Sequence, residues 1–76
     1  MTNTAKLQGK MRECGYSLEK LANIVGISPT GLFNKVHNQS EFLVSEVQTI
    51  SAVLNLSQED VNVIFFGEDV EFNSTK

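Results

Sequence analysis

Apolar residues recur along most of the chain at intervals of three and four positions, the spacing of one face of an α-helix. No stretch alternates apolar and polar residues in the manner of a β-strand. Glycine, serine and proline interrupt the helical pattern at short intervals and divide it into five segments. The pattern therefore predicts an all-α fold, a compact bundle of five short helices.

The first two helices have boundaries that the sequence marks clearly. The first is expected over residues 4–14, before Gly15, and the second is expected between Ser17, a good N-cap, and Gly26. The side chains expected in the core from these helices are Leu7, Met11, Cys14, Leu18, Leu21, Ala22 and Val25. Both helices are amphipathic, so each needs neighbours to cover its apolar face.

The third helix follows the second after an unusually short turn. Ser28 can cap it and Pro29 suits its first position, so a helix is predicted over residues 29–37 with Leu32 and Val36 underneath. Ile27 is expected to fill the angle of the turn. The residues then expected to face water are Thr30, Gly31, Asn34 and Lys35. This arrangement is a helix-turn-helix, whose protruding second helix fits the major groove of DNA.

The fourth and fifth helices complete the predicted domain over residues 1–67. Ser45 and Gln48 have the spacing of a capping box at the start of the fourth helix, and Ser57 is expected to cap the fifth, which Gly67 ends. The apolar residues expected inside are Leu43, Val47, Ile50, Leu54, Val61, Ile64 and Phe65. Residues 68–76 are polar and acidic, and a flexible tail is predicted there.

The stretch SLEKLANIVGISPTGLFNKV resembles the helix-turn-helix of the lambda repressor and Cro superfamily (XRE-type), with Ala22 and Gly26 at its small-residue positions. The continuation FLVSEVQTISAVLNLSQEDV, closing in IFF, is similar to small Cro-like regulators of phages of Gram-positive bacteria. The resemblance spans residues 5–66. It implies a five-helix bundle, sequence-specific binding to double-stranded operator DNA, and control of a switch between lysogenic and lytic growth.

On this interpretation, the third helix contacts DNA. Hydroxyl groups and helix amides at its start can bind phosphates or base edges, and an asparagine can pair with adenine. Lysines on one face of the first helix can reach the flanking backbone. The candidate DNA-binding residues are Ser28, Thr30, Gly31, Phe33, Asn34, Lys35, His37, Asn38, Lys6 and Lys10.

Several of these residues also have a purely structural interpretation. Ser28 caps its helix whatever else it does. Phe33 is expected either to lie on a thymine methyl group or to be half-buried against the second helix. His37 fits an ordinary solvated helix end, and Lys6 and Lys10 fit a solvated helix face. Thr30 and Asn34 are the strongest candidates, because the apolar residues beneath them direct them outward.

Charge favours an alternative function with the same fold. Residues 1–40 carry a net charge of +3, whereas residues 41–76 carry −6, and the sequence pI is about 4.9. The third helix has no arginine, the commonest reader of guanine. Operator binding is therefore expected to need a homodimer or a second DNA-binding protein. Alternatively, the chain is an antirepressor whose acidic half, including Phe66, Val70 and Phe72, binds a phage repressor and blocks its DNA-reading surface.

The sequence offers no catalytic motif, and no enzyme activity, cofactor or metal site is predicted. One histidine and one cysteine lie on different segments, and their spacing matches no common metal site. The lone cysteine, the absence of a signal-peptide pattern and the absence of a membrane-spanning run favour the host bacterial cytoplasm.

Overall fold

Five α-helices make up most of the described chain. A computed structural model describes residues 1–67. The helices are α1 (Thr4–Cys14), α2 (Leu18–Val25), α3 (Pro29–Val36), α4 (Val44–Val53) and α5 (Gln58–Phe65). No strand occurs within residues 1–67, so the predicted all-α bundle is confirmed. The acidic tail predicted for residues 68–76, with Val70 and Phe72, lies outside the described residues.

Three helices begin at the serines that the sequence marks as N-caps. The Oγ atoms of Ser17, Ser28 and Ser57 each accept a hydrogen bond from the backbone N–H three residues further on, at 3.1, 2.9 and 3.0 Å. Each bond satisfies an amide that the first turn of a helix leaves without an acceptor. These three helix starts are therefore set locally, and their predictions are confirmed.

Helix α1 ends at Cys14 before Gly15, as predicted, but the burial of Cys14 differs from the prediction. Gly15 adopts a left-handed conformation with φ of 79°, and the Tyr16 N–H turns back to the Met11 carbonyl oxygen at 2.8 Å. In this type of helix end, the residue after the glycine commonly packs against the last turn. Tyr16 packs against the core, whereas Cys14, which was predicted to be buried, is exposed.

The start of α4 also corrects the prediction. The helix begins at Val44, and its N-cap is Leu43, whose N–H donates to the Glu46 carboxylate at 2.8 Å. The predicted box of Ser45 and Gln48 is therefore wrong, because the helix starts two residues earlier and Glu46 fills the capping role. Leu43 has extended backbone dihedrals outside the helix and is exposed, so it does not continue the apolar face of α4.

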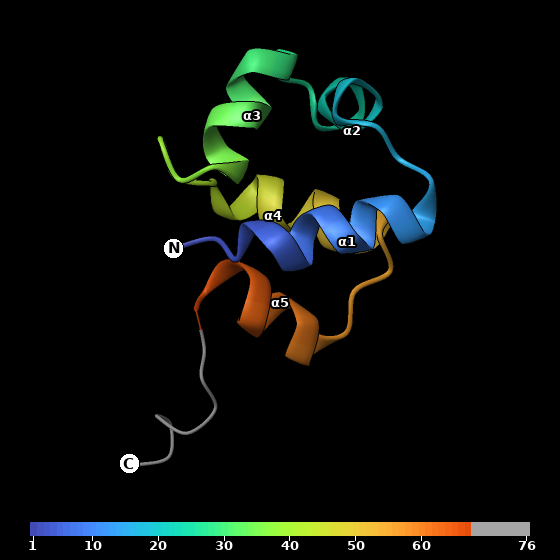
Figure 1. Cartoon of the computed structure of the whole chain (residues 1–76), viewed down its shortest axis with the longest axis vertical. Coiled ribbons are helices and arrows are strands. Elements are labelled where there is room, and N and C mark those ends of the chain that lie inside the picture. Colours follow the sequence, from blue (N-terminus) through green and yellow to red (C-terminus); the bar gives the residue numbers. More distant parts are fainter. Residues whose placement is uncertain (68–76) are drawn as a thin grey trace.

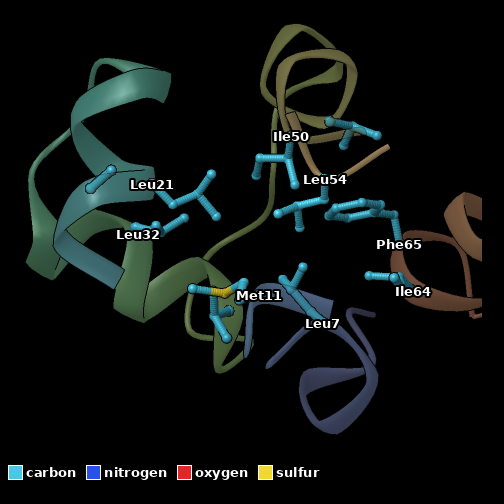
Figure 2. Packing of buried hydrophobic residues seen from close by; sticks show 11 residues of the cluster. Leu7, Met11, Leu21, Leu32, Ile50, Leu54, Ile64 and Phe65 are labelled. Atoms are coloured by element: carbon cyan, nitrogen blue, oxygen red, sulfur yellow. The ribbon is translucent and has the colours of Figure 1, made fainter. Parts of the chain in front are cut away.

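The core draws side chains from all five helices. Figure 2 shows the labelled residues directed toward a common interior. The buried apolar residues are Leu7, Met11, Leu21, Ala22, Leu32, Val36, Val47, Ile50, Leu54, Ile64 and Phe65, each of which was predicted to be inside. Helical periodicity therefore identified the core, because burial of one face is what the pattern encodes.

The bundle places α2 and α3 at one end and α5 at the other, with α1 and α4 between them (Figure 1). Helices α2 and α3 are in contact across the turn that joins them, and α2 also contacts α4. Leu21 and Leu32 are fully buried, and Ile27 in the turn packs against the core. None of the helices described combines the length and apolar character needed to cross a membrane.

Candidate nucleic-acid interface

The N-terminal end of α3 presents several hydrogen-bond donors to solvent. Ser28 and Thr30 are exposed, and Pro29 between them has no amide hydrogen. The Gly31 N–H is bonded to Ser28 Oγ, so the Thr30 N–H is the amide of this turn that has no intrahelical acceptor. Together with the two hydroxyl groups it makes a small set of donors at the positive end of the helix dipole. Such an arrangement suits an anionic oxygen.

Gly31 lies directly behind the capping hydroxyl. A Cβ atom built at this position would come within 3.1 Å of Ser28 Oγ, closer than an ordinary contact. Ser28 Oγ is the atom that such a Cβ would meet within 4 Å. Gly31 therefore leaves space for the capping hydroxyl group of Ser28. The residue itself is half-buried.

The outer face of α3 is held in place by two residues on its inner face. Leu32 and Val36 are both 0% exposed, which fixes the rotation of the helix. Phe33 is 48% exposed, and Asn34 is half-buried with its backbone carbonyl oxygen bonded to the Gln39 N–H. About half of Phe33 is therefore covered, in line with the half-buried alternative, and the other half is open to solvent.

Phe33 has a partner on the same face. Its ring and that of His37, one turn later, have centroids 4.2 Å apart and planes inclined at 38°. Helix α3 ends at Val36, one residue before the predicted boundary, and His37 is its C-cap. The two rings form a partly exposed aromatic pair whose apolar surface is suited to contact with bases or with apolar side chains.

Lys35 does not face water as the sequence indicated. Its Nζ contacts both carboxylate oxygens of Glu46 in α4, at 2.6 and 2.8 Å, and the Lys35 and Glu46 side chains are only 17% and 8% exposed. The lysine side chain is long enough to reach the Glu46 carboxylate on the neighbouring helix α4. The spacing of residues within α3 does not predict such a contact. Lys35 is therefore a tie between α3 and α4.

Burial shifts the pKa of Glu46 upward, but its hydrogen bonds and charge partner outweigh this effect. The hydrogen bond from Lys35, the backbone N–H of Leu43 and the positive charge of Lys35 all stabilise the carboxylate form, and the net pKa lies below its ordinary value of 4.5. Glu46 therefore remains charged at neutral pH and continues to neutralise Lys35. This pair leaves little positive charge on α3 for a phosphate.

Asn38 is also engaged within the chain. Its Oδ1 accepts from the Thr2 N–H at 2.7 Å, and its Nδ2 donates to the Thr2 carbonyl oxygen at 3.0 Å. Asn38 has a positive φ of 67°, which asparagine tolerates better than most residues. Asn38 therefore has a structural role, since both polar atoms of its side chain are bonded to Thr2.

Lys6 and Lys10 face α5. Their Nζ atoms lie 3.7 and 3.5 Å from the Asp60 carboxylate, and Lys10 also lies 3.7 Å from Glu13. Backbone and side-chain hydrogen bonds from Ser57, offset in part by burial, lower the pKa of Asp60 with help from Lys10. These ion pairs are partly exposed, so each of them is weak. The nearby carboxylates nevertheless offset part of the positive charge of the two lysines.

Of the candidate residues at α3, Ser28, Thr30 and Phe33 are exposed, whereas Gly31, Asn34 and His37 are half-buried. The side chains of Lys6, Lys10, Lys35 and Asn38 have partners within the chain. The sequence pattern did not identify Glu46 as a partner of the site, although its carboxylate binds the Lys35 ammonium group. Its only local signal is an acidic residue in the first turn of α4, and nothing in the sequence pairs it with α3.

No cluster of three or more histidine, cysteine or acidic residues within residues 1–67 is arranged to hold a metal ion. Searches against known proteins provide no further assignment: no family model matches the chain, and neither a curated protein nor a solved structure matches it significantly.

Proposed function

We propose that this chain is a Cro-like transcriptional regulator that binds double-stranded operator DNA through α3 in a phage lysogeny–lysis switch. The observation that carries the proposal is the exposed donor set of Ser28 and Thr30 on a helix fixed from below by Leu32 and Val36. A helix about 10–12 Å across fits a major groove about 12 Å wide. The XRE-type resemblance of the sequence supports the same function.

The donors at the start of α3 account for positioning on the DNA backbone. Phosphate oxygens are the commonest partners of hydroxyl groups, backbone amides and helix N-termini in protein–DNA complexes. Asn34 and Phe33 follow on the same side of the helix, where an amide can pair with adenine and a ring can contact a thymine methyl group. In this proposal, Ser28 and Thr30 position the helix, while Phe33 and Asn34 read the sequence.

The charge of the interface favours a homodimer as the form that binds DNA. Lys6, Lys10 and Lys35 are each paired with an acidic side chain, so one copy has few cations to offer to phosphates. Salt-dependent affinity comes mainly from such cations. Two copies on adjacent half-sites would double the contacts and raise the affinity without new charges. The proposed location of this activity is the host bacterial cytoplasm.

The test uses two substitutions at Ser28 that differ mainly in charge. Aspartate and asparagine both cap helices well, so Ser28→Asp and Ser28→Asn are expected to keep α3 folded. Aspartate places a negative charge where a phosphate would lie, and we expect it to weaken binding to the flanking regulatory DNA by about tenfold or more, in a mobility-shift titration. Asparagine retains donors at this position and is expected to keep most of the affinity.

Circular dichroism and urea unfolding provide the control that both variants are folded equally well. Equal DNA affinities for the two variants would show that α3 does not approach phosphate at Ser28. Binding by the wild-type chain that lacks both sequence preference and salt dependence would also contradict operator recognition.

A second candidate function is favoured by the same ion pairs. With three lysines neutralised, the described chain is better suited by charge to a basic protein than to DNA. In that case the chain is an antirepressor that binds a phage repressor and blocks its DNA-reading surface. Adding the chain to a preformed complex of the neighbouring repressor and its operator would then release the DNA, whereas an operator-binding regulator would compete only for its own sites.

A further inference from the structure

Helices α3 and α4 each contain a single charged side chain, and the two charges are paired. Lys35 is the charged residue of Pro29–Val36, and Glu46 is the charged residue of Val44–Val53. The end of α3 lies next to the start of α4 (Figure 1), and the ion pair joins these two ends. The +1 of Lys35 and the −1 of Glu46 therefore cancel, although α3 taken alone is a positively charged helix.

The geometry of the pair opposes release of the Lys35 ammonium group. Its Nζ lies 2.6 and 2.8 Å from the two carboxylate oxygens of Glu46, whose side chain is only 8% exposed. If Lys35 turned away toward a ligand, a nearly buried carboxylate would lose its charge partner, which is costly. The Leu43 N–H would remain bonded to that carboxylate, but this donor carries no full charge. Lys35 is therefore held at α4 by the cost of leaving Glu46 alone.

Lys35 is close in sequence to the residues proposed to contact DNA. Asn34 directly precedes it, and Phe33 lies one position earlier on the same helix. A lysine ammonium group on its flexible four-carbon side chain is a frequent partner of DNA phosphates. Without the opposing carboxylate, α3 would therefore offer one unneutralised cation beside the groups proposed to read the bases.

We propose that Glu46 limits the DNA affinity of α3 by withholding Lys35 from phosphate, so that Lys35 is a latent phosphate contact. The inference rests on the proposed function, because it requires DNA to approach α3. Each phosphate that a cation neutralises adds to the affinity for DNA of any sequence, in a salt-dependent manner. Withholding one cation in each copy lowers this general affinity, and operator binding then depends more on two copies acting together.

The test measures binding of the full chain to a random-sequence duplex at several salt concentrations, by fluorescence anisotropy. Glu46→Gln removes the charge that holds Lys35, and we expect it to bind the duplex more tightly than the wild type. The slope of log affinity against log salt concentration should steepen by about 0.9 for each copy bound, the value for one further phosphate contact. The gain is then about tenfold at about 50 mM salt and about fourfold at about 200 mM.

Two further variants assign the gain to Lys35. Glu41→Gln makes the same change in net charge, from −3 to −2, at an exposed carboxylate that forms no ion pair within residues 1–67, and it should leave the salt slope unchanged. Lys35→Gln in the Glu46→Gln background removes the released cation and restores the net charge of −3. We expect this double variant to return both the affinity and the slope to the wild-type values. Circular dichroism checks that each variant is folded.

Equal affinities and slopes for Glu46→Gln and Glu41→Gln would overturn the proposal. A double variant that binds the duplex less tightly than the wild type would also overturn it, because Lys35 would then contact phosphate in the wild-type chain. This second comparison holds even if Glu46→Gln alone fails to fold, since the double variant leaves no unpaired buried charge. Failure of operator recognition gives a different result: the wild type would bind operator and random duplexes alike, while the gain that depends on Lys35 would remain.

Discussion

The carboxylate of Glu46 determines whether the Lys35 ammonium group of α3 is available to a binding partner. Glu46 accepts hydrogen bonds from the Lys35 ammonium group and from the Leu43 N–H, so one side chain joins two helices and caps one of them. The positions of Thr30, Phe33 and Asn34 follow from the spacing of the buried residues beneath them. The position of the Lys35 ammonium group cannot be inferred from that spacing. A long, flexible side chain can bend toward a nearby carboxylate, whatever side of the helix its Cα atom lies on.

Glu46→Gln tests this role at the residue scale. The amide oxygen can still accept from Leu43, but the charge opposite Lys35 is lost, and we expect the free energy of unfolding at neutral pH to fall by about 1–2 kcal/mol. Because the folded-state pKa of Glu46 is depressed, its contribution is present above the ordinary pKa of 4.5 and is lost as the pH falls through the lower folded-state value. Urea unfolding at several pH values measures both effects.

Glu41→Gln is the matched control, because Glu41 is exposed and forms no ion pair within the described residues. Its unfolding free energy is expected to stay within about 0.5 kcal/mol of the wild type. Equal effects of the two substitutions, or a difference between Glu46→Gln and the wild type that persists unchanged into acid, would show that the Lys35–Glu46 pair does not stabilise the fold.

At the scale of the element, α3 begins with a capping serine, Ser28, and has a glycine, Gly31, next to the capping hydroxyl group. Glycine within a helix is less favourable than alanine by about 1 kcal/mol, so its presence at position 31 needs a reason. The reason is the distance of 3.1 Å that would separate an added Cβ from Ser28 Oγ. The sequence revealed Ser28 as a cap, but only the geometry connects Gly31 to it.

This connection predicts that substitutions at the two positions are not additive. Gly31→Ala gains helix propensity but disturbs the cap, so we expect a net change of less than about 0.5 kcal/mol. Ser28→Ala alone is expected to cost about 1 kcal/mol. In the Ser28→Ala background the obstructing oxygen is gone, and Gly31→Ala is expected to stabilise the protein by about 1 kcal/mol.

Thermal or urea unfolding of the four proteins gives the coupling free energy directly. A Gly31→Ala effect that is the same in both backgrounds would show that the capping hydroxyl and the glycine act independently.

At the scale of the whole molecule, the N-terminal segment ties the end of α3 to the end of α5. Thr2 is held by the Asn38 side chain, and Asn3 donates its N–H to the Ile64 carbonyl oxygen at 2.7 Å. Thr4 Oγ1 donates to the Val36 carbonyl oxygen at 2.6 Å. These bonds join residues more than thirty positions apart, so they constrain the bundle as a unit and hold α3 from its C-terminal end.

Substitutions of Asn38 separate its hydrogen bonds from its backbone conformation. Asn38→Gly keeps a positive φ readily but loses both side-chain bonds to Thr2, and we expect it to cost about 2 kcal/mol of unfolding free energy. Asn38→Ala loses the same bonds and also strains the backbone at φ of 67°, so we expect about 1–2 kcal/mol more. Urea unfolding measures both values.

Asn55→Gly is a matched control, because Asn55 also has a positive φ, of 55°, and its side chain makes no hydrogen bond within residues 1–67. It is expected to change the unfolding free energy by less than about 0.5 kcal/mol. If Asn55→Gly lost as much unfolding free energy as Asn38→Gly, the hydrogen bonds between Asn38 and Thr2 would contribute little to stability.

The sequence by itself determined the features that depend on neighbouring residues in the chain. Serine caps at positions 17, 28 and 57, glycine ends at positions 15 and 26, and the helical spacing of buried residues are encoded within single turns, so helix order and core membership could be predicted. Tertiary structure alone decided which side chains remain available for binding. The contacts of Lys35 with Glu46, of Asn38 with Thr2 and of Lys10 with Asp60 join segments distant in sequence, and local patterns carry no information about such encounters.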